Sequence, residues 1–402
     1  MRKYLSKAYR PAMIGTAIEY YDVTLYGYMA PILIQVFLPF IDKLSAYFYY
    51  FAFEVFAALC QICGSYVFGR MGDQYGRKKA MYYTMLGTSL VTFLISIVPT
   101  YADIGIYAAI LFASCRAIQS FFLGGEYNGG AIYCLEHESN SNKHGLVSGI
   151  YGALTVFGVL IAAITSTTIM YFGKEYFRLA YGLSFIFALL TYYLRRQAVE
   201  TPEYLASKVN QTKAKAVPYK WSIFFTIALI SVLSGVLYGL PTRIFNVILP
   251  IATGISSVNI MIINCITTIL FMVSLIVAGY VADHFKPIEV MKRTAMAIAL
   301  LVVPTMALVD TKTLVAIILA KLVFITLSAA LIGPFHAWTQ SISHVKNRYL
   351  QVSIAYSTGK IVAIMILPLT ILIFERYHSL LLASLILVII AIVAYKVLNR
   401  KK

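Results

Sequence analysis

Runs of about twenty apolar residues recur along this 402-residue chain and alternate with short polar segments. A helix of that length spans the hydrocarbon core of a bilayer. Apolar residues make up 60% of the chain and charged residues 12%, whereas a soluble domain has about half and about a quarter. The pattern excludes a water-soluble fold and predicts an all-α integral membrane protein.

The number of apolar runs predicts twelve transmembrane helices. Twelve helices of about 22 residues would use about 264 residues and leave the rest for short connections and the two termini. We expect helices near residues 10–38, 46–69, 80–99, 104–130, 145–172, 178–196, 221–242, 258–282, 293–309, 312–333, 349–374 and 379–397.

A basic polar stretch at residues 197–220 divides the chain into two halves. We expect an N-terminal six-helix bundle at 1–196, a cytoplasmic linker at 197–220 and a C-terminal six-helix bundle at 221–402. Equal halves joined in this way are typical of transporters built from two repeated bundles with the substrate path between them. A membrane sensor or a membrane enzyme could share the layout.

The chain has 33 Lys and Arg residues against 16 Asp and Glu, a net charge of +17. On a soluble protein this excess would suggest nucleic acid. Here 24 of the basic residues fall on the two termini and the even-numbered loops, and about five fall on the opposite side. Basic residues gather on cytoplasmic loops, so both termini are expected in the cytoplasm, with no nucleic-acid partner.

Ordinary signs of catalysis or metal binding are missing from the sequence. The five cysteines lie in apolar runs and do not resemble a disulfide framework. The six histidines, His336 among them, are scattered near span ends, and we interpret them as solvated loop residues. We therefore expect no catalytic residues, no metal and no cofactor.

Charged residues inside the first predicted helix need an explanation, because burying a charge in hydrocarbon costs about 2.5–3.5 kcal/mol or more. Glu19 and Asp22 are three residues apart and share one helix face, which Tyr26 extends by another turn. Such residues persist where they line a cavity or find a partner.

The helix near 104–130 carries the matching polar residues. Arg116 lies near its middle, Gln119 follows on the same face, and Glu126 lies about 15 Å nearer the cytoplasm. Acids facing a buried arginine could bind a zwitterion or an anion and relay a proton. The alternative is a structural ion pair that only locks the two helices together.

Two lysines, Lys321 and Lys360, fall near mid-membrane in the second half. A buried amine often has an anionic partner. We hypothesise that Lys360 contacts the anionic group of a solute. The alternatives are an ion pair between Lys360 and Glu54, or a Lys321 side chain that extends to the membrane surface.

Three blocks of sequence resemble the metabolite:proton symporters, a branch of the major facilitator superfamily. Residues 15–27, GTAIEYYDVTLYG, are similar to the helix 1 signature of that branch. Residues 69–79, GRMGDQYGRKK, closely match the loop 2–3 motif of the whole superfamily. Arg116-Ala-Ile-Gln119 followed by Gly124-Gly-Glu126-Tyr127 is similar to the helix 4 signature. The resemblance covers about residues 12–204.

The loop 2–3 block implies a cytoplasmic gate latch, as in the superfamily. Its residues are Gly69, Gly72, Asp73, Gly76, Arg77 and Lys78. The glycines permit a tight turn and close helix approach. Asp73 and Arg77 can make charged contacts to neighbouring helix ends. Simple anchoring of the loop at the membrane surface is the alternative for the basic residues.

The resemblance implies the major facilitator fold and proton-coupled import of a small carboxylate or zwitterion by alternating access. The expected partners are the solute, protons and the bilayer of a bacterial inner membrane, and we expect a monomer. Two alternatives stay open: uptake of proline or betaine as compatible solutes, and a transport-silent sensor. Departures from the family, such as Gln61-Ile62 in place of an Arg-Pro pair, leave the solute open.

Overall fold

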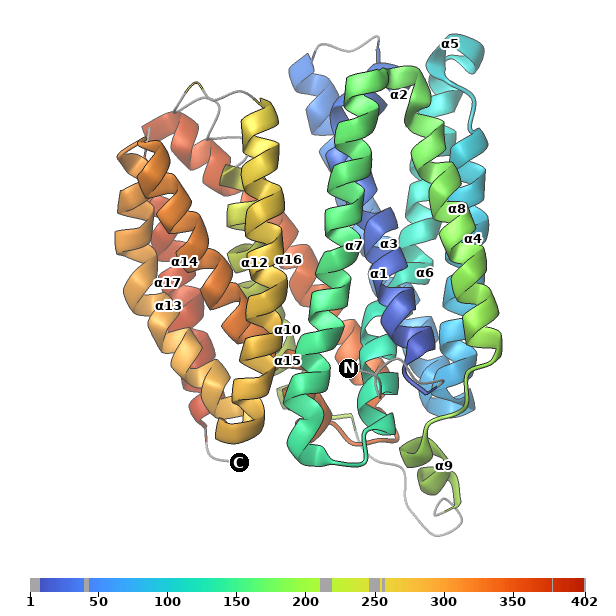
Figure 1. Cartoon of the computed structure of the whole chain (residues 1–402), viewed down its shortest axis with the longest axis vertical. Coiled ribbons are helices and arrows are strands. Elements are labelled where there is room, and N and C mark those ends of the chain that lie inside the picture. Colours follow the sequence, from blue (N-terminus) through green and yellow to red (C-terminus); the bar gives the residue numbers. More distant parts are fainter. Residues whose placement is uncertain are drawn as a thin grey trace. The chain divides into compact units, whose positions relative to one another are not determined.

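The computed structural model describes residues 8–39, 43–209, 219–245, 254, 257–377 and 379–400. Within these residues the regular structure is helical, with no strand (Figure 1). Eleven helices there are long and apolar enough to cross a membrane. The pair α1 (Arg10–Tyr28) and α2 (Ala30–Phe37), joined at Met29, occupies the range predicted for the first span. The predicted all-α membrane fold is confirmed.

The helices follow one another with short connections. After α2 come α3 (Lys43–Tyr75), α4 (Arg77–Ile97), α5 (Tyr101–Ile104), α6 (Ile106–His137), α7 (His144–Phe172), α8 (Phe177–Arg196) and α9 (Pro202–Val209). The second half contains α10 (Trp221–Gly239), the π-helical turn η5 (Leu240–Ile244), α12 (Ser257–Phe285), α13 (Pro287–Asp310), α14 (Leu314–Ile332), α15 (Phe335–Ile342), α16 (Arg348–Tyr377) and α17 (Leu381–Asn399). Single 3₁₀ turns precede α7 and α8, at Ser141–Lys143 and Lys174–Tyr176.

Several helices run past the spans that hydropathy predicted. Helix α3 ends at Tyr75 rather than near 69, and α6 ends at His137 rather than near 130. Hydropathy reports only the hydrocarbon part of a helix, whereas backbone hydrogen bonding continues into the polar region. These polar extensions carry part of the site described below.

The chain forms two compact units. The first comprises 1–137, 154–219 and 344–357, and the second comprises 138–153, 220–343 and 358–402. Helices α7 and α16 therefore each contribute residues to both units. The predicted bundle boundaries at 196 and 221 stay a prediction.

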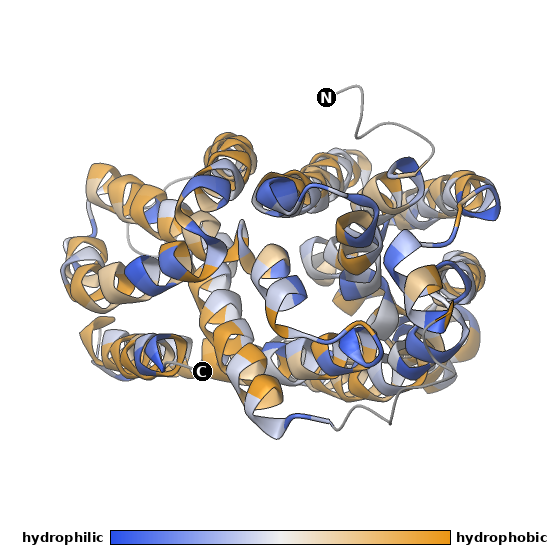
Figure 2. Ribbon diagram, turned by 90° about the horizontal axis from the view of Figure 1, so that it is seen from below, coloured by the Kyte–Doolittle hydropathy of each residue, from blue (hydrophilic) through white to orange (hydrophobic). Residues whose placement is uncertain are grey.

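The first unit is organised by α6, which packs along α3 and α4. Glycines allow the close approach of α3 and α6: a Cβ atom added at Gly64 would lie 1.7 Å from the carbonyl oxygen of Phe121. An apolar cluster of buried residues from α1, α2, α4, α6, α7 and α8 includes Leu25, Phe112 and Tyr181. Apolar residues predominate along the helices in Figure 2, as expected for lipid-facing segments.

The second unit contains a break that corrects one expectation. Helix α14 ends before Gly333-Pro334, and α15 then places His336 in the interior, where 2% of the residue is exposed. Its ring lies 5.6 Å from that of Tyr151. The hydroxyl of Ser148 accepts from the His336 amide and donates to the Gly333 carbonyl. The interpretation of His336 as a solvated loop residue was wrong, because the helix continues inward after the break.

The contact between α3 and α6 yields a stability prediction. Gly64→Ala should lower the free energy of unfolding by about 1–3 kcal/mol, because a methyl group there meets backbone that cannot rotate away. Gly182→Ala on α8 is the matched control, since an added Cβ at that position has no neighbour within 4 Å. Thermal unfolding of the detergent-purified variants measures both. Equal melting temperatures for the two variants would contradict the packing.

Candidate functional site

Four buried side chains of the first unit form one continuous chain of hydrogen bonds. The hydroxyl of Thr92 on α4 donates to Oδ2 of Asp22 at 3.3 Å and accepts from Nε2 of Gln119 at 2.8 Å. Oε1 of Gln119 in turn accepts from Nη1 of Arg116 at 2.5 Å. The structure therefore brings together three of the predicted residues, on α1 and α6, through a threonine that the sequence did not indicate.

Asp22 and Arg116 do not pair directly among the described residues. The guanidinium of Arg116 lies over the ring of Tyr26, with Cζ 4.5 Å from the centroid. Oδ1 of Asp22, Nε of Arg116 and the hydroxyl of Tyr181 are buried and have no hydrogen-bond partner in the described part of the chain. Buried polar atoms are nearly always satisfied, so three unsatisfied atoms in one cluster suit a site that receives a proton or a ligand.

Glu126 lies in a different environment from Asp22. Both carboxylate oxygens accept from the guanidinium of Arg195, and Oε2 also accepts from Thr84. Arg195 donates further to the carbonyl of Met81 at 2.7 Å and is 1% exposed. Arg195 lies in the last turn of α8, and its side chain is buried against α1 and α6. Glu126 is thus neutralised within a buried pair.

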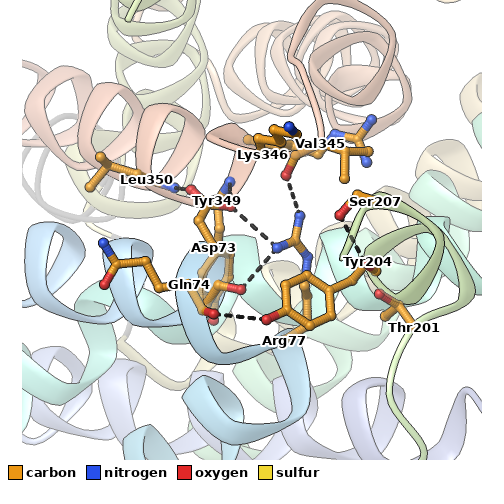
Figure 3. Close-up of polar contacts among 12 residues, drawn as sticks. Asp73, Gln74, Arg77, Thr201, Tyr204, Ser207, Val345, Lys346, Tyr349 and Leu350 are labelled. Atoms are coloured by element: carbon orange, nitrogen blue, oxygen red, sulfur yellow. Dashed lines mark hydrogen bonds and ion pairs between the residues drawn. The ribbon is translucent and has the colours of Figure 1, made fainter. Parts of the chain in front are cut away.

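The predicted latch residue Asp73 lies in the last turn of α3, where it holds the start of α16 (Figure 3). Its two oxygens accept from the backbone amides of Tyr349 at 3.1 Å and Leu350 at 2.9 Å. The first amides of a helix have no partner within that helix and carry a partial positive charge. The expected contact between Asp73 and a neighbouring helix end is confirmed.

Arg77 contacts Asp73 and the Val345 carbonyl (Figure 3) and connects them to a larger ion network. Its guanidinium donates to Asp73 at 3.3 Å, to the Val345 carbonyl at 2.7 Å and to both oxygens of Glu136. Arg348 donates to Glu136 at 2.8 Å and to Glu203 at 2.7 Å. The sequence missed Glu136 and Arg348, because each resembles an ordinary charged residue beside a cytoplasmic loop.

Glycines give the latch its close geometry. An added Cβ at Gly72 would lie 1.8 Å from the ring of Tyr349, and one at Gly69 would lie 2.7 Å from the Cα atom of Leu350. Gly76 has φ +109°, a conformation that L side chains rarely adopt, and it forms the one-residue turn between α3 and α4. After that turn, Glu200 accepts from the backbone amides of Arg77 and Lys78 and closes the start of α4.

The second unit contains a related contact. Asp283, in the last turn of α12, accepts from the amides of Gly145 at 2.6 Å and Leu146 at 2.9 Å, in the first turn of α7. Residues 279–284, GYVADH, keep only part of the pattern at 69–79, yet Asp283 makes the same kind of contact as Asp73. Lys286, at φ +67°, lies in the turn between α12 and α13, as Gly76 does between α3 and α4.

The two predicted lysines lie in the second unit. Lys321 on α14 is 1% exposed, and its ammonium donates to Oδ1 of Asn264 on α12. Lys321 therefore does not extend to the membrane surface. Lys360 on α16 is half-buried. Its contact with a solute anion stays a prediction. Glu19 on α1 is buried at 3% exposure.

A family model described as sugar (and other) transporter matches residues 8–223. The proline/betaine transporter of Salmonella typhimurium is 32% identical over 208 residues, which cover 50% of this chain and 41% of that protein. The glycine betaine/proline/ectoine/pipecolic acid transporter OusA of Dickeya dadantii is 27% identical over 414 residues, covering 97% of this chain and 81% of the relative. The chain thus matches less than half the length of the Salmonella relative.

Solved structures show the fold. A structure of the proton:xylose symporter XylE bound to 6-bromo-6-deoxy-D-glucose has a TM-score of 0.81 at 16% identity and covers 98% of this chain and 95% of its own. The human organic anion transporter MFSD10 has a TM-score of 0.71 at 12% identity, covering 98% and 99%. The chain has the major facilitator fold and belongs to the sugar (and other) transporter family.

Proposed function

We propose that the protein is a secondary transporter that couples import of a small carboxylate or zwitterion to proton entry. The observation that carries the proposal is the buried chain from Asp22 to Arg116, whose acid oxygen and guanidinium nitrogen both lack partners among the described residues. A permanent structural pair would satisfy both atoms. An enzyme is disfavoured, because the family consists of transporters.

Asp22 carries the proton in this proposal. Glu126 is held by Arg195, so its charge is already compensated, whereas Oδ1 of Asp22 is free to accept. The transporter would change from outward-open to inward-open with Asp22 protonated and the solute anion bound to Arg116. It would then release the proton and the solute on the cytoplasmic side. Direct pairing of Asp22 with Arg116 belongs to another state of that cycle. The proposed path of the solute and the proton also includes Glu19, one turn from Asp22 on α1, together with Tyr26 and Gln119.

Uptake of a betaine-like compatible solute is the second candidate, and a tyrosine cluster favours it. Tyr127 on α6 lies between Tyr20 and Tyr356, with ring centroids 5.2 and 5.1 Å apart. Aromatic faces attract quaternary ammonium groups through cation–π contacts. The names of the Salmonella and Dickeya relatives point to the same class of solute.

The latch residues control the cytoplasmic side in this proposal. Asp73 and Asp283 each fix the first turn of a helix that belongs to both units, α16 and α7. Releasing those turns would permit the movement that alternating access requires. The cytoplasmic placement of both termini follows from the basic loops. A monomer suffices for this mechanism.

Transport in liposomes separates a carrier from the transport-silent sensor. Purified protein should accumulate radiolabelled glycine betaine or succinate when the outside is acidic, and a proton ionophore should abolish accumulation. A counterflow screen with proline, betaine and di- and tricarboxylates identifies the solute class. A sensor would move none of them.

Asp22→Asn should abolish proton-driven accumulation, because an amide keeps the shape of the side chain but cannot exchange a proton. Solute exchange without a gradient should survive. Accumulation at the wild-type level with unchanged pH dependence would refute the coupling role. Asp103→Asn, in the short helix α5 that follows α4, is the matched control and should transport normally.

Asp73→Asn should loosen the start of α16. Hydrogen bonds to a charged acceptor contribute about 1.5–3 kcal/mol each, so the amides of Tyr349 and Leu350 should exchange hydrogen roughly tenfold faster or more. Hydrogen exchange read by mass spectrometry measures this rate. Asp283→Asn is the control and should accelerate exchange at Gly145 and Leu146 only. Unchanged exchange at α16 in Asp73→Asn would contradict the latch.

Lys360→Met should raise the half-saturation concentration for the transported solute about tenfold, because the solute anion would lose a charged contact. Lys396→Met, an exposed position on α17, should leave it unchanged. Initial rates of radiolabelled uptake over a concentration series measure the effect. Normal affinity in Lys360→Met would remove this residue from the site.

A further inference from the structure

Thr92 occupies the only step between Asp22 and the rest of the hydrogen-bonded chain that the described residues provide. Its single hydroxyl donates to the carboxylate of Asp22 and accepts from the amide of Gln119. The residue is 0% exposed on α4. Gln119 then holds Arg116 through its other amide atom. The neutral side chains of Thr92 and Gln119 therefore lie between the buried carboxyl group of Asp22 and the buried guanidinium.

From this geometry we infer that Thr92, supported by Gln119, is a positioning residue that keeps Asp22 and Arg116 apart, so that Asp22 can take up a proton and Arg116 can take up a solute anion. This role rests on the proposed proton-coupled function. An acid and a guanidinium in contact would each satisfy the other. The neutral spacer leaves one oxygen of Asp22 and Nε of Arg116 available.

Several groups face Asp22 from the helices packed around it. Arg116 on α6 carries a charge, Ser184 on α8 offers a hydroxyl, and Tyr181 on α8 and Tyr21 on α1 are phenols beside it. Helix α4 contributes the hydroxyl of Thr92, which does not titrate. Arg116 is thus the group whose approach to Asp22 would most favour ionisation, and Gln119 restrains it.

The spacer role of Thr92 predicts in which direction the titration midpoint of Asp22 moves when the hydroxyl is removed. Thr92→Val removes the hydroxyl, so the amide of Gln119 or the guanidinium of Arg116 can approach Asp22 directly. An opposite charge in contact shifts the titration of a carboxyl by about 1–3 pH units. Asp22 should then ionise at a pH about one unit lower or more. If Thr92 served only as a hydrogen-bond donor to the carboxylate, its loss would move the titration to higher pH instead.

Infrared titration of the purified full-length protein in lipid nanodiscs measures this directly. The carbonyl-stretch band of protonated Asp22 is identified by its loss in Asp22→Asn. Thr92→Val should move the midpoint of that band to lower pH, and Thr92→Ser, which keeps the hydroxyl, should restore the wild-type midpoint. Gln119→Leu frees Arg116 while keeping the Thr92 hydroxyl, although that hydroxyl loses its donor, and should move the midpoint in the same direction.

Three outcomes would overturn the inference: an unchanged midpoint in Thr92→Val, a midpoint moved to higher pH, or no band lost in Asp22→Asn. If Thr92→Val does not fold, Gln119→Leu decides by the same criteria. The readout needs no solute. The midpoint could therefore move to lower pH in Thr92→Val while the wild-type protein accumulates no solute in liposomes. That result would contradict the proposed function and support the spacer role of Thr92.

Discussion

Compensation of buried charge is the constraint on which this structure depends. The membrane-spanning helices contain acids and bases that hydrocarbon cannot solvate, so each must find a partner inside the protein. Glu126 and Glu136 find arginines, and these pairs fix α6 against α4, α8 and the start of α16. Asp22 and Arg116 differ, because neutral side chains stand between them. That difference is the basis of the transport role proposed for Asp22 and Arg116.

Two carboxylates, each in the last turn of one helix, bind the first turn of another helix. Asp73 and Asp283 each bind two unsatisfied amides at the beginning of a helix, which is where a negative charge is most favourable. Glycines at Gly69 and Gly72 allow the first of these contacts, because side chains there would collide with α16. In the second unit Asp283 makes such a contact although residues 279–284 keep only part of the pattern at 69–79.

Much of the fold was predictable, because hydropathy and the placement of basic residues identify membrane helices in a sequence. Hydropathy located the spans but not the polar helix ends, since backbone hydrogen bonds continue beyond the apolar residues. It therefore missed the extension of α6 that carries Glu136 and the inward course of α15 that buries His336. The motif at 69–79 was recognised because its glycines and charges are closely spaced in sequence.

The sequence by itself determined the class of fold, the polar residues of α1 and α6, and the latch carboxylate Asp73, because these follow from hydropathy and local spacing. Only the tertiary structure decided which partner each buried charged side chain contacts. Thr92 meets Asp22 across 70 residues, and Arg195 meets Glu126 across 69. Such pairings depend on how helices rotate and pack against one another, and no local pattern of residues specifies that.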